Sequence, residues 1–134
     1  MNKAGKICIS LIFLGAILAG CSSRKTADAG AVYTNPVLHS DYSDPDVVRS
    51  GDDYYMVASS FNCVPGLPVL HSNDLVSWEL IGYALERLQP EEYYSSVRHG
   101  GGIWAPSIRM HNGEFYIFYP DPDHGIFMVK ASDP

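Results

Sequence analysis

A short pattern that occurs twice is the feature that most constrains the fold of this 134-residue chain. Residues 45–57 align without gaps on residues 106–118, at a constant offset of 61 (106 − 45 and 118 − 57). Each copy reads as a proline, an apolar strand, a polar turn with glycine and an aromatic-rich strand, which is the pattern of a β-hairpin. Residues 69–75 match residues 128–134 at an offset of 59. Short strands repeated at this spacing predict the blades of a β-propeller, which closes with about four or more blades.

The repeat predicts an all-β fold of which this chain holds only a part. After the first copy the sequence continues into a further strand predicted over Val76–Ile81, whereas the second copy stops at Pro134. At 61 residues per blade, the residues after position 31 make about one and three-quarters blades. We therefore expect residues 32–134 to be the truncated N-terminal part of a propeller domain, with open sheet edges that favour aggregation.

The first 20 residues have the pattern of an export signal. Two lysines precede the apolar run Ile7–Leu18, which is shorter than the ~20 residues of a membrane-spanning helix. The run is followed by Leu-Ala-Gly and Cys21, which resembles the bacterial lipobox. We therefore predict a lipoprotein signal peptide over residues 1–20 and lipidation of Cys21, so that the protein is exported and anchored to a bacterial membrane. The small, polar residues 21–31 are expected to be a flexible tether.

The charge balance argues against a nucleic-acid partner. The sequence has 9 Lys and Arg residues against 15 Asp and Glu residues, a net charge of −6. Removal of residues 1–20 takes away two lysines and no acidic residue, which leaves a net charge of 7 − 15 = −8. Phosphate backbones are bound by clusters of Lys and Arg, which this sequence lacks. A neutral ligand fits an exported, acidic protein better.

Local patterns give three further expectations. Cys63 has no partner once the signal-peptide cysteine is removed and Cys21 carries lipid, so it is expected to be a small buried residue. Trp78 is expected in the core of its blade. The stretch Tyr83–Tyr94 is expected to connect the blades and to be partly helical, with Pro90 interrupting the helix.

A set of motifs occurs in a fixed order along the chain. They are Asn35-Pro36-Val37-Leu38, Ser43-Asp44-Pro45-Asp46-Val47, Gly51-Asp52-Asp53-Tyr54-Tyr55, Pro65-Gly66, His71-Ser72-Asn73-Asp74-Leu75 with Trp78, and Gly102-Ile103-Trp104-Ala105-Pro106-Ser107. In this order they resemble the start of glycoside hydrolase family 43, and the resemblance covers residues 35–134. It implies a five-bladed propeller that hydrolyses arabinofuranosyl or xylosyl units of plant cell-wall carbohydrate by an inverting mechanism.

The resemblance places one catalytic residue in this chain. Asp44 matches the family's general base, the Asp of an Asp-Pro pair on the innermost strand of the first blade. In inversion the base lies about 6.5–9.5 Å from the acid, so that a water fits between base and sugar. Taken alone, an Asp-Pro pair is more often part of a turn. Asp46 is the poorer candidate, because it is expected to point to the opposite face if Asp44 begins a strand.

The resemblance also implies sugar contacts and a missing acid. Trp104 is expected to stack on a sugar ring. Phe61 matches a position that lines the sugar pocket, and a core role fits it equally well. The family's second Asp and its acidic Glu belong to later blades, so the fragment itself is expected to be inactive. The five glutamates are assigned no catalytic role; they are Glu79, Glu86, Glu91, Glu92 and Glu114.

Two alternatives and the partners complete the sequence-based picture. A non-catalytic, glycan-binding propeller lipoprotein would keep the pocket without the acid. A retaining enzyme that acts on fructans is expected to carry Asn-Asp-Pro-Asn, whereas this chain has Ser43-Asp44-Pro45-Asp46. No cofactor or metal site is predicted, since the histidines lack zinc-site spacing and the residues give no support for a structural calcium ion at the propeller axis. The expected partners are an oligo- or polysaccharide and, through the lipid, a membrane.

Overall fold

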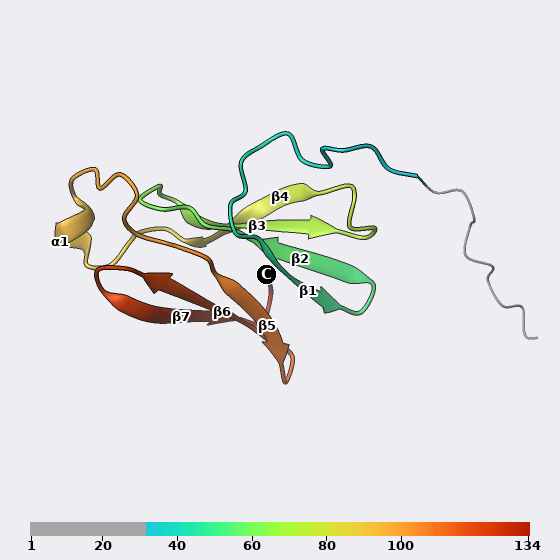
Figure 1. Ribbon diagram of the computed structural model, residues 1–134. Helices are drawn as coiled ribbons and strands as arrows, with labels where there is room; N and C mark the ends of the chain where they lie inside the picture. Colours follow the sequence, from blue (N-terminus) through green and yellow to red (C-terminus); the bar gives the residue numbers. More distant parts are fainter. Residues whose placement is uncertain (1–31) are drawn as a thin grey trace, which may run out of the picture. The chain divides into compact units, whose positions relative to one another are not determined.

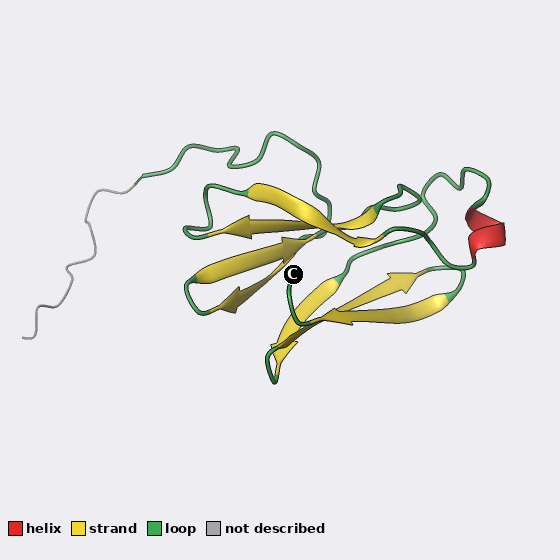
Figure 2. Ribbon diagram, turned by 180° about the vertical axis from the view of Figure 1, so that it is seen from behind, coloured by secondary structure: helices red, strands yellow, loops and turns green. Residues whose placement is uncertain are grey.

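Seven strands in two antiparallel sheets form most of the regular structure in residues 32–134, the part of the chain that the computed structural model describes. The first sheet has the order β1 (Asp46–Ser50), β2 (Asp53–Val57), β3 (Gly66–Ser72) and β4 (Glu79–Leu85). The second has the order β5 (Ser107–His111), β6 (Glu114–Asp121) and β7 (Gly125–Ala131). One helical turn, α1 (Glu91–Tyr94), lies in the connection between the sheets (Figures 1 and 2). The expected all-β class is confirmed.

Both predicted hairpins are present, and they share one register. Val47 pairs with Met56 in the first hairpin, and Ile108 pairs with Ile117 in the second, each position 61 residues further on (108 − 47 and 117 − 56). The second turn is Asn112-Gly113, where both residues have positive φ (51° and 78°) as a tight two-residue hairpin turn requires. The strands β3 and β7 are also at the predicted offset of 59 (125 − 66 and 131 − 72).

Several element boundaries differ from the sequence-based prediction. The strand predicted over Val76–Ile81 begins only at Glu79 and continues to Leu85, so residues 83–85 belong to β4 and not to the connection between the blades. The Asp74 carboxylate accepts hydrogen bonds from the N–H groups of Val76 (2.8 Å) and Ser77 (2.6 Å) and holds both residues in a turn. The helical turn α1 begins directly after Pro90, which has φ −72° and is free of helical clashes at this position. Pro90 therefore starts the helix and does not interrupt it.

Cys63 and Trp78 do not lie in the core, so both of those predictions were wrong. Cys63 is exposed in the loop between β2 and β3, where its N–H donates to the carbonyl of Ser60 (2.9 Å) and closes a turn. Trp78 is half-buried beside the β3–β4 turn, and its indole N–H donates to the carbonyl of Leu75 (3.0 Å). In both cases local turn hydrogen bonds direct the residue away from the space between the sheets.

The core lies between the two sheets. Its buried apolar residues come from β2, β3, β5 and β6 and from the connection; they are Val57, Leu67, Val69, Leu88, Ile103, Ile108, Phe115, Ile117 and Tyr119. The rings of Tyr55 and Phe115 meet edge to face across the sheets, with centroids 5.1 Å apart. Burial of these side chains supplies the main force that holds the sheets together.

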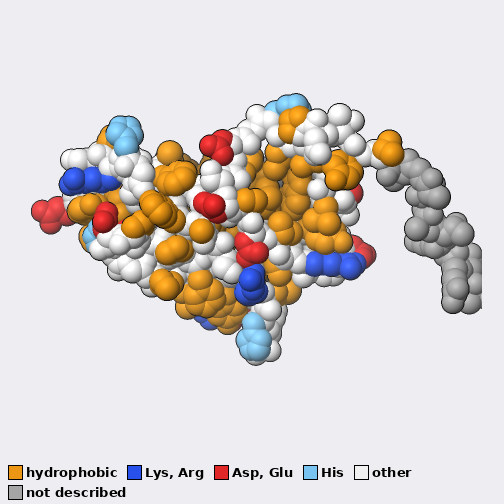
Figure 3. Space-filling model, viewed as in Figure 1, with side chains coloured by type: hydrophobic (Ala, Val, Ile, Leu, Met, Phe, Trp, Pro, Cys, Tyr) orange, Lys and Arg blue, Asp and Glu red, His pale blue; other side chains and the backbone are white. Residues whose placement is uncertain are grey.

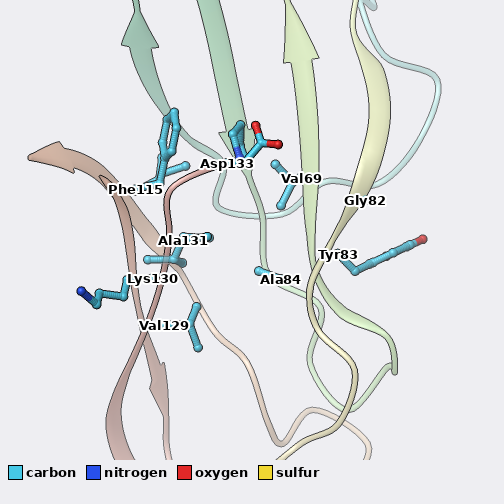
Figure 4. A pocket seen from close by; sticks show the side chains of 12 residues that line it. Val69, Gly82, Tyr83, Ala84, Phe115, Val129, Lys130, Ala131 and Asp133 are labelled. Carbon is cyan, nitrogen blue, oxygen red and sulfur yellow. The ribbon is translucent and has the colours of Figure 1, made fainter. Parts of the chain in front are cut away.

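Toward the outer strands the packing between the sheets loosens. A cavity of about 310 Å³ separates Ala84 of β4 from Val129 and Ala131 of β7 (Figure 4). Hydrophobic side chains on β4 and β7 also reach the surface, among them Tyr83 and Ile126 (Figure 3). The two sheets therefore pack less closely at β4 and β7 than at the buried core.

A carboxylate joins the innermost strands of the two sheets. Asp46, the first residue of β1, accepts hydrogen bonds from the N–H of Ile108 (2.8 Å) and from Nη1 of Arg109 (2.5 Å) on β5. Burial by itself raises the pKa of Asp46, but the hydrogen bonds from Arg109 and Ile108 outweigh it and hold the pKa below the ordinary 3.8. The charged form of Asp46 therefore stabilises the junction of the sheets.

Asp46→Asn in the full-length protein should lower the free energy of unfolding at pH 7 by about 1–2 kcal/mol. The change removes a charged hydrogen-bond acceptor, and the estimate is kept low because the Arg109 side chain is 61% exposed. Since the native pKa of Asp46 is lowered, its contribution is present above pH 3.8 and lost as the pH falls through the native pKa. Melting temperatures of wild type and variant should therefore differ at pH 7 and approach each other as the pH falls below 3.8.

The matched control for Asp46→Asn is Asp52→Asn. The Asp52 carboxylate lies 3.6 Å from Arg49 on a fully exposed turn and joins no second sheet. Its replacement should change stability by less than about 0.5 kcal/mol. Equal destabilisation by the two substitutions would contradict the role given to Asp46.

Candidate active site

The two longest connections, residues 58–65 between β2 and β3 and residues 86–106 between β4 and β5, lie at one end of the two sheets. Because neighbouring strands run antiparallel, the short β6–β7 turn and the segment that enters β1 share that end, whereas residues 73–78 between β3 and β4 lie at the other end. In Figure 1 these connections and α1 are at the left, while the tight β1–β2 and β5–β6 turns are at the other end. Asp44, Phe61 and Trp104 belong to three of these segments. The fold therefore brings the three residues predicted from the sequence to the same end.

Asp44 is exposed and lies just before β1, in an unusual backbone conformation. Its φ is 50°, which is uncommon for a residue other than glycine and persists only where neighbouring groups hold it. Ser59, which follows β2, supplies that support. The Ser59 N–H donates to the carbonyl of Ser43 (2.9 Å), and the Ser59 hydroxyl donates to Oδ2 of Asp44 (2.9 Å).

The reason given for preferring Asp44 over Asp46 was wrong. Asp44 does not begin the strand, because β1 starts at Asp46. Alternation along a strand would moreover place residues two apart on the same face. What separates the two carboxylates is their bonding: Asp46 is engaged by Arg109 and Ile108, whereas Asp44 is exposed and is held through one oxygen.

A backbone bridge joins the β2–β3 loop to the segment that enters β5. The N–H of Phe61 donates to the carbonyl of Ile103 (2.9 Å), and the N–H of Ile103 donates to the carbonyl of Phe61 (3.0 Å). Gly102 has a φ of 89°, and a Cβ at this position would lie 2.3 Å from the carbonyl oxygen of Phe61. The close approach therefore requires glycine. The bridge fixes the half-buried Phe61 at the site end of the sheets.

Trp104 is 43% exposed and is held by hydrogen bonds at both its backbone and its ring. Its N–H donates to the carbonyl of Pro120 (2.9 Å), and its indole N–H donates to the carbonyl of Gly100 (2.7 Å). The next residue, Ala105, has a φ of 24° and donates its N–H to the hydroxyl oxygen of Ser59 (2.7 Å). Ser59 thus links Asp44 to the segment that carries Trp104.

A buried carboxylate, that of Asp121, anchors the long connection that carries α1. Asp121 is 4% exposed and accepts hydrogen bonds from the Tyr94 hydroxyl, the N–H of Asp123 (2.9 Å) and Nδ1 of His124 (3.3 Å). Burial raises the pKa of Asp121, but these hydrogen bonds outweigh it and keep the pKa below its usual value. Burial and the hydrogen bond to Asp121 raise the pKa of Tyr94. The polar β6–β7 loop therefore holds the connection in place.

The sequence alone indicated no functional role for Ser59 and no hydrogen-bond partner for Asp46 or Asp121. Their partners are 15 and 46 residues away for Ser59, and 62 and 63 residues away for Asp46. A serine after a strand carries no local signal of such contacts. The repeat aligns position 46 with position 107, the first residues of β1 and β5, and so indicates that these two strands occupy equivalent places in their sheets.

Other predictions fall outside what the structure describes. Cys21 and the predicted signal peptide and tether lie outside the described residues. Within residues 32–134, no helix is long and apolar enough to cross a membrane. In the same part of the chain, no group of three His, Cys, Asp or Glu side chains is arranged to hold a metal ion.

Comparison with known proteins shows the family. The model for glycosyl hydrolases family 43 matches residues 33–134, nearly all of the described part of the chain. This chain belongs to glycoside hydrolase family 43. The resemblance seen in the ordered motifs is thereby confirmed.

Two curated relatives are similar over most of the chain. A non-reducing end alpha-L-arabinofuranosidase of Bacteroides ovatus is 38% identical over 122 residues, which is 88% of this chain and 23% of that protein. A putative beta-xylosidase of Xylanibacter ruminicola is 43% identical over 102 residues, which is 76% of this chain and 18% of that protein. The chain thus spans less than a quarter of either relative.

Solved structures agree with the fold. The Bacteroides ovatus protein titled xyloglucan PUL GH43B superposes with a TM-score of 0.65 at 40% identity, covering 75% of this chain and 21% of that chain. The BlXynB protein of Bacillus licheniformis gives a TM-score of 0.63 at 40% identity, covering 76% of this chain and 22% of that chain. These relatives are five-bladed propellers, and the two sheets described here correspond to part of one.

Gly102→Ala should destabilise the full-length protein far more than Gly100→Ala. Both glycines have positive φ, so alanine is strained at either position. At Gly102 the new Cβ would also meet the Phe61 carbonyl, whereas at Gly100 it would have no atom within 4 Å. We expect a loss of about 1 kcal/mol for Gly100→Ala and of about 3 kcal/mol or more for Gly102→Ala in thermal unfolding. Similar losses of stability for the two variants would show that the Phe61 carbonyl leaves room for a side chain at position 102.

Proposed function

We propose that the full-length protein is an inverting glycoside hydrolase with Asp44 as its general base. The observation that carries the proposal is the position of the Asp44 carboxylate: it is exposed at the site end of a family 43 fold and is held by Ser59. The substrate class is arabinofuranosyl or xylosyl units of plant cell-wall carbohydrate. Relatives named as an arabinofuranosidase and as a putative xylosidase support this class.

The geometry of Asp44 suits the activation of water. Oδ2 accepts the hydrogen bond from Ser59, and no hydrogen bond within residues 32–134 uses Oδ1. Oδ1 can therefore accept a proton from a water molecule that attacks the anomeric carbon. Attack from the face opposite the leaving group inverts the configuration of the sugar. A carboxylate takes up a proton in this role only in its ionised form.

Inversion also needs a general acid about 6.5–9.5 Å from the base, and we propose that residues outside this chain supply it. Glu79 and Glu114 are the first residues of β4 and β6, at the end of the sheets opposite to Asp44. Glu91 is paired with Arg87 at 2.6 Å. Residues 32–134 alone should therefore bind sugar weakly, if at all, and not hydrolyse it.

The two aromatic residues at the site end support a sugar pocket. Trp104 offers a wide, partly exposed apolar face, and hydrogen bonds to Gly100 and Pro120 limit its motion. Sugar rings present an apolar C–H face that stacks on such an indole while water is excluded. Phe61, fixed by its bridge to Ile103, adds a second aromatic ring at the same end of the sheets.

Asp44→Asn in the full-length protein should lower kcat by about 10²–10⁴-fold, because an amide cannot take a proton from water. Hydrolysis of 4-nitrophenyl arabinofuranoside and xyloside measures the loss. Asp41→Asn is the matched control: Asp41 is also exposed, and within residues 32–134 its carboxylate accepts one hydrogen bond, from the Ser43 hydroxyl (3.0 Å), so kcat should stay within about threefold. A loss below tenfold for Asp44→Asn would reject the assignment.

Proton NMR of the same reaction tests the stereochemistry. The first-formed sugar should have the anomeric configuration opposite to that of the substrate. A first product of retained configuration would exclude Asp44 as the base of an inverting reaction. No turnover in the full-length protein, with sugar binding intact, would favour a glycan-binding lipoprotein.

Export and membrane anchoring form a separate part of the proposal, supported by the sequence before residue 22. Cys21→Ser, expressed in a bacterial host, should move the protein from the membrane fraction to the soluble fraction, because a serine cannot carry the thioether-linked lipid. Immunoblots of the two fractions measure this change. Cys63→Ser is the control and should stay with the membrane, since Cys63 lies in the folded domain. Unchanged membrane association of Cys21→Ser would refute lipid anchoring at this residue.

A further inference from the structure

Among residues 32–134, Ser59 is the one side chain that forms hydrogen bonds both to the candidate base and to the segment carrying Trp104. We propose that Ser59 is a positioning residue that sets the direction of the Asp44 carboxylate relative to the sugar-binding residues. This inference rests on the proposed role of Asp44 as general base. Ser59 itself touches neither substrate nor water in this role, and acts through the carboxylate.

The hydrogen bonds of Ser59 leave its hydroxyl a single orientation. A serine hydroxyl has one proton to donate and two lone pairs to accept with. The N–H of Ala105 can only donate, and it lies 2.7 Å from the Ser59 oxygen. The Ser59 proton is therefore free for Oδ2 of Asp44, at 2.9 Å. Both bonds are satisfied together only when the hydroxyl proton points at the carboxylate.

Burial of Ser59 favours its hydrogen bond to Asp44 over hydrogen bonds to water. Ser59 is 7% exposed, so water competes poorly for its hydroxyl, and a lost partner would be costly. Asp44, by contrast, is exposed, and a free carboxylate there would rotate about its side-chain bonds. A bond to Oδ2 stops that rotation and leaves Oδ1 for the attacking water. The exposed catalytic group thus takes its direction from a buried neighbour.

The same hydroxyl also couples the base to the second sheet. Ala105 directly follows Trp104, and its φ of 24° is an uncommon conformation that needs support. The bond from Ala105 to Ser59 provides that support from the first sheet. Trp104 keeps its own hydrogen bonds to Gly100 and Pro120, so loss of the Ser59 hydroxyl would shift the carboxylate relative to a ring that stays in place. Misplacement of a reacting group by about 1 Å can cost about 10²-fold in rate.

The neighbouring Ser60 does not share the contact of Ser59 with the Asp44 carboxylate. Its hydroxyl accepts a hydrogen bond from the N–H of Leu67 (3.1 Å) and so holds the β2–β3 loop. Ser59 and Ser60 are identical in chemistry and adjacent in sequence, yet only Ser59 contacts Asp44. Ser60→Ala is therefore the matched control, since it removes a hydroxyl from the same loop without touching the carboxylate.

The experiment compares Ser59→Ala and Ser60→Ala in the full-length protein, with 4-nitrophenyl arabinofuranoside and xyloside as substrates. Ser59→Ala should lower kcat by about 10–100-fold and leave KM within about twofold, because the variant loses orientation of the base and keeps its sugar contacts. Ser60→Ala should keep kcat within about threefold. A role limited to folding would lower the melting temperature and change KM and kcat together.

A second pair of variants separates the hydroxyl from the size of the side chain. Ser59→Thr and Ser59→Val have the same shape, and only threonine keeps a hydroxyl. We expect kcat of Ser59→Thr to exceed that of Ser59→Val by about tenfold or more at similar melting temperatures. This pair also decides the matter if Ser59→Ala fails to fold.

Two results would overturn the inference about Ser59 and leave the proposed function intact. In both, Asp44→Asn is inactive. The first result is an equal kcat for Ser59→Thr and Ser59→Val. The second is a kcat of Ser59→Ala within threefold of the wild-type value. An active Asp44→Asn variant would contradict the proposed function instead. It would show that Asp44 is not the general base, and the role of Ser59 would then fall with it.

Discussion

Backbone hydrogen bonds between Phe61 and Ile103 join the two sheets at the end where the long connections meet. They are possible because Gly102 has no side chain to collide with the Phe61 carbonyl. With this bridge in place, the loop after β2 and the segment before β5 run next to each other. The contact of Ser59 with Ala105 and the placement of Trp104 both depend on that proximity. The site is therefore a property of the junction and belongs to neither sheet alone.

The junction also explains why unusual backbone conformations gather here. Asp44, Phe61 and Ala105 all have positive φ although none is glycine. Each is opposed by steric strain of order 1 kcal/mol, which neighbouring contacts must offset. Hydrogen bonds from Ser59 to Asp44, from Ala105 to Ser59 and between Phe61 and Ile103 do this. Such strain is typical of functional sites, where side chains are directed by the needs of a ligand.

The sheets were largely predictable from the sequence, and the site only in part. The repeated strand–turn–strand pattern and the Asn112-Gly113 turn specify the hairpins, because Asn-Gly accepts the positive φ that a tight two-residue turn requires. Asp44 and Trp104 were found through motifs and lie at the same end. The support of Asp44 by Ser59 could not be predicted, because it joins residues far apart in sequence. For Cys63 a rule about residue type failed, since a turn hydrogen bond decided its exposure.

The unequal ends of the sheets have an evolutionary consequence. At one end, two-residue turns at 51–52 and 112–113 set the pairing of the strands, and a change in their length would shift every side chain of a strand. At the other end, the segments 58–65 and 86–106 carry the binding residues and are free of that requirement. New substrate preferences can therefore arise by exchanging these segments while the strands stay the same. Relatives named for arabinosides and for xylosides can in this way diverge on one framework.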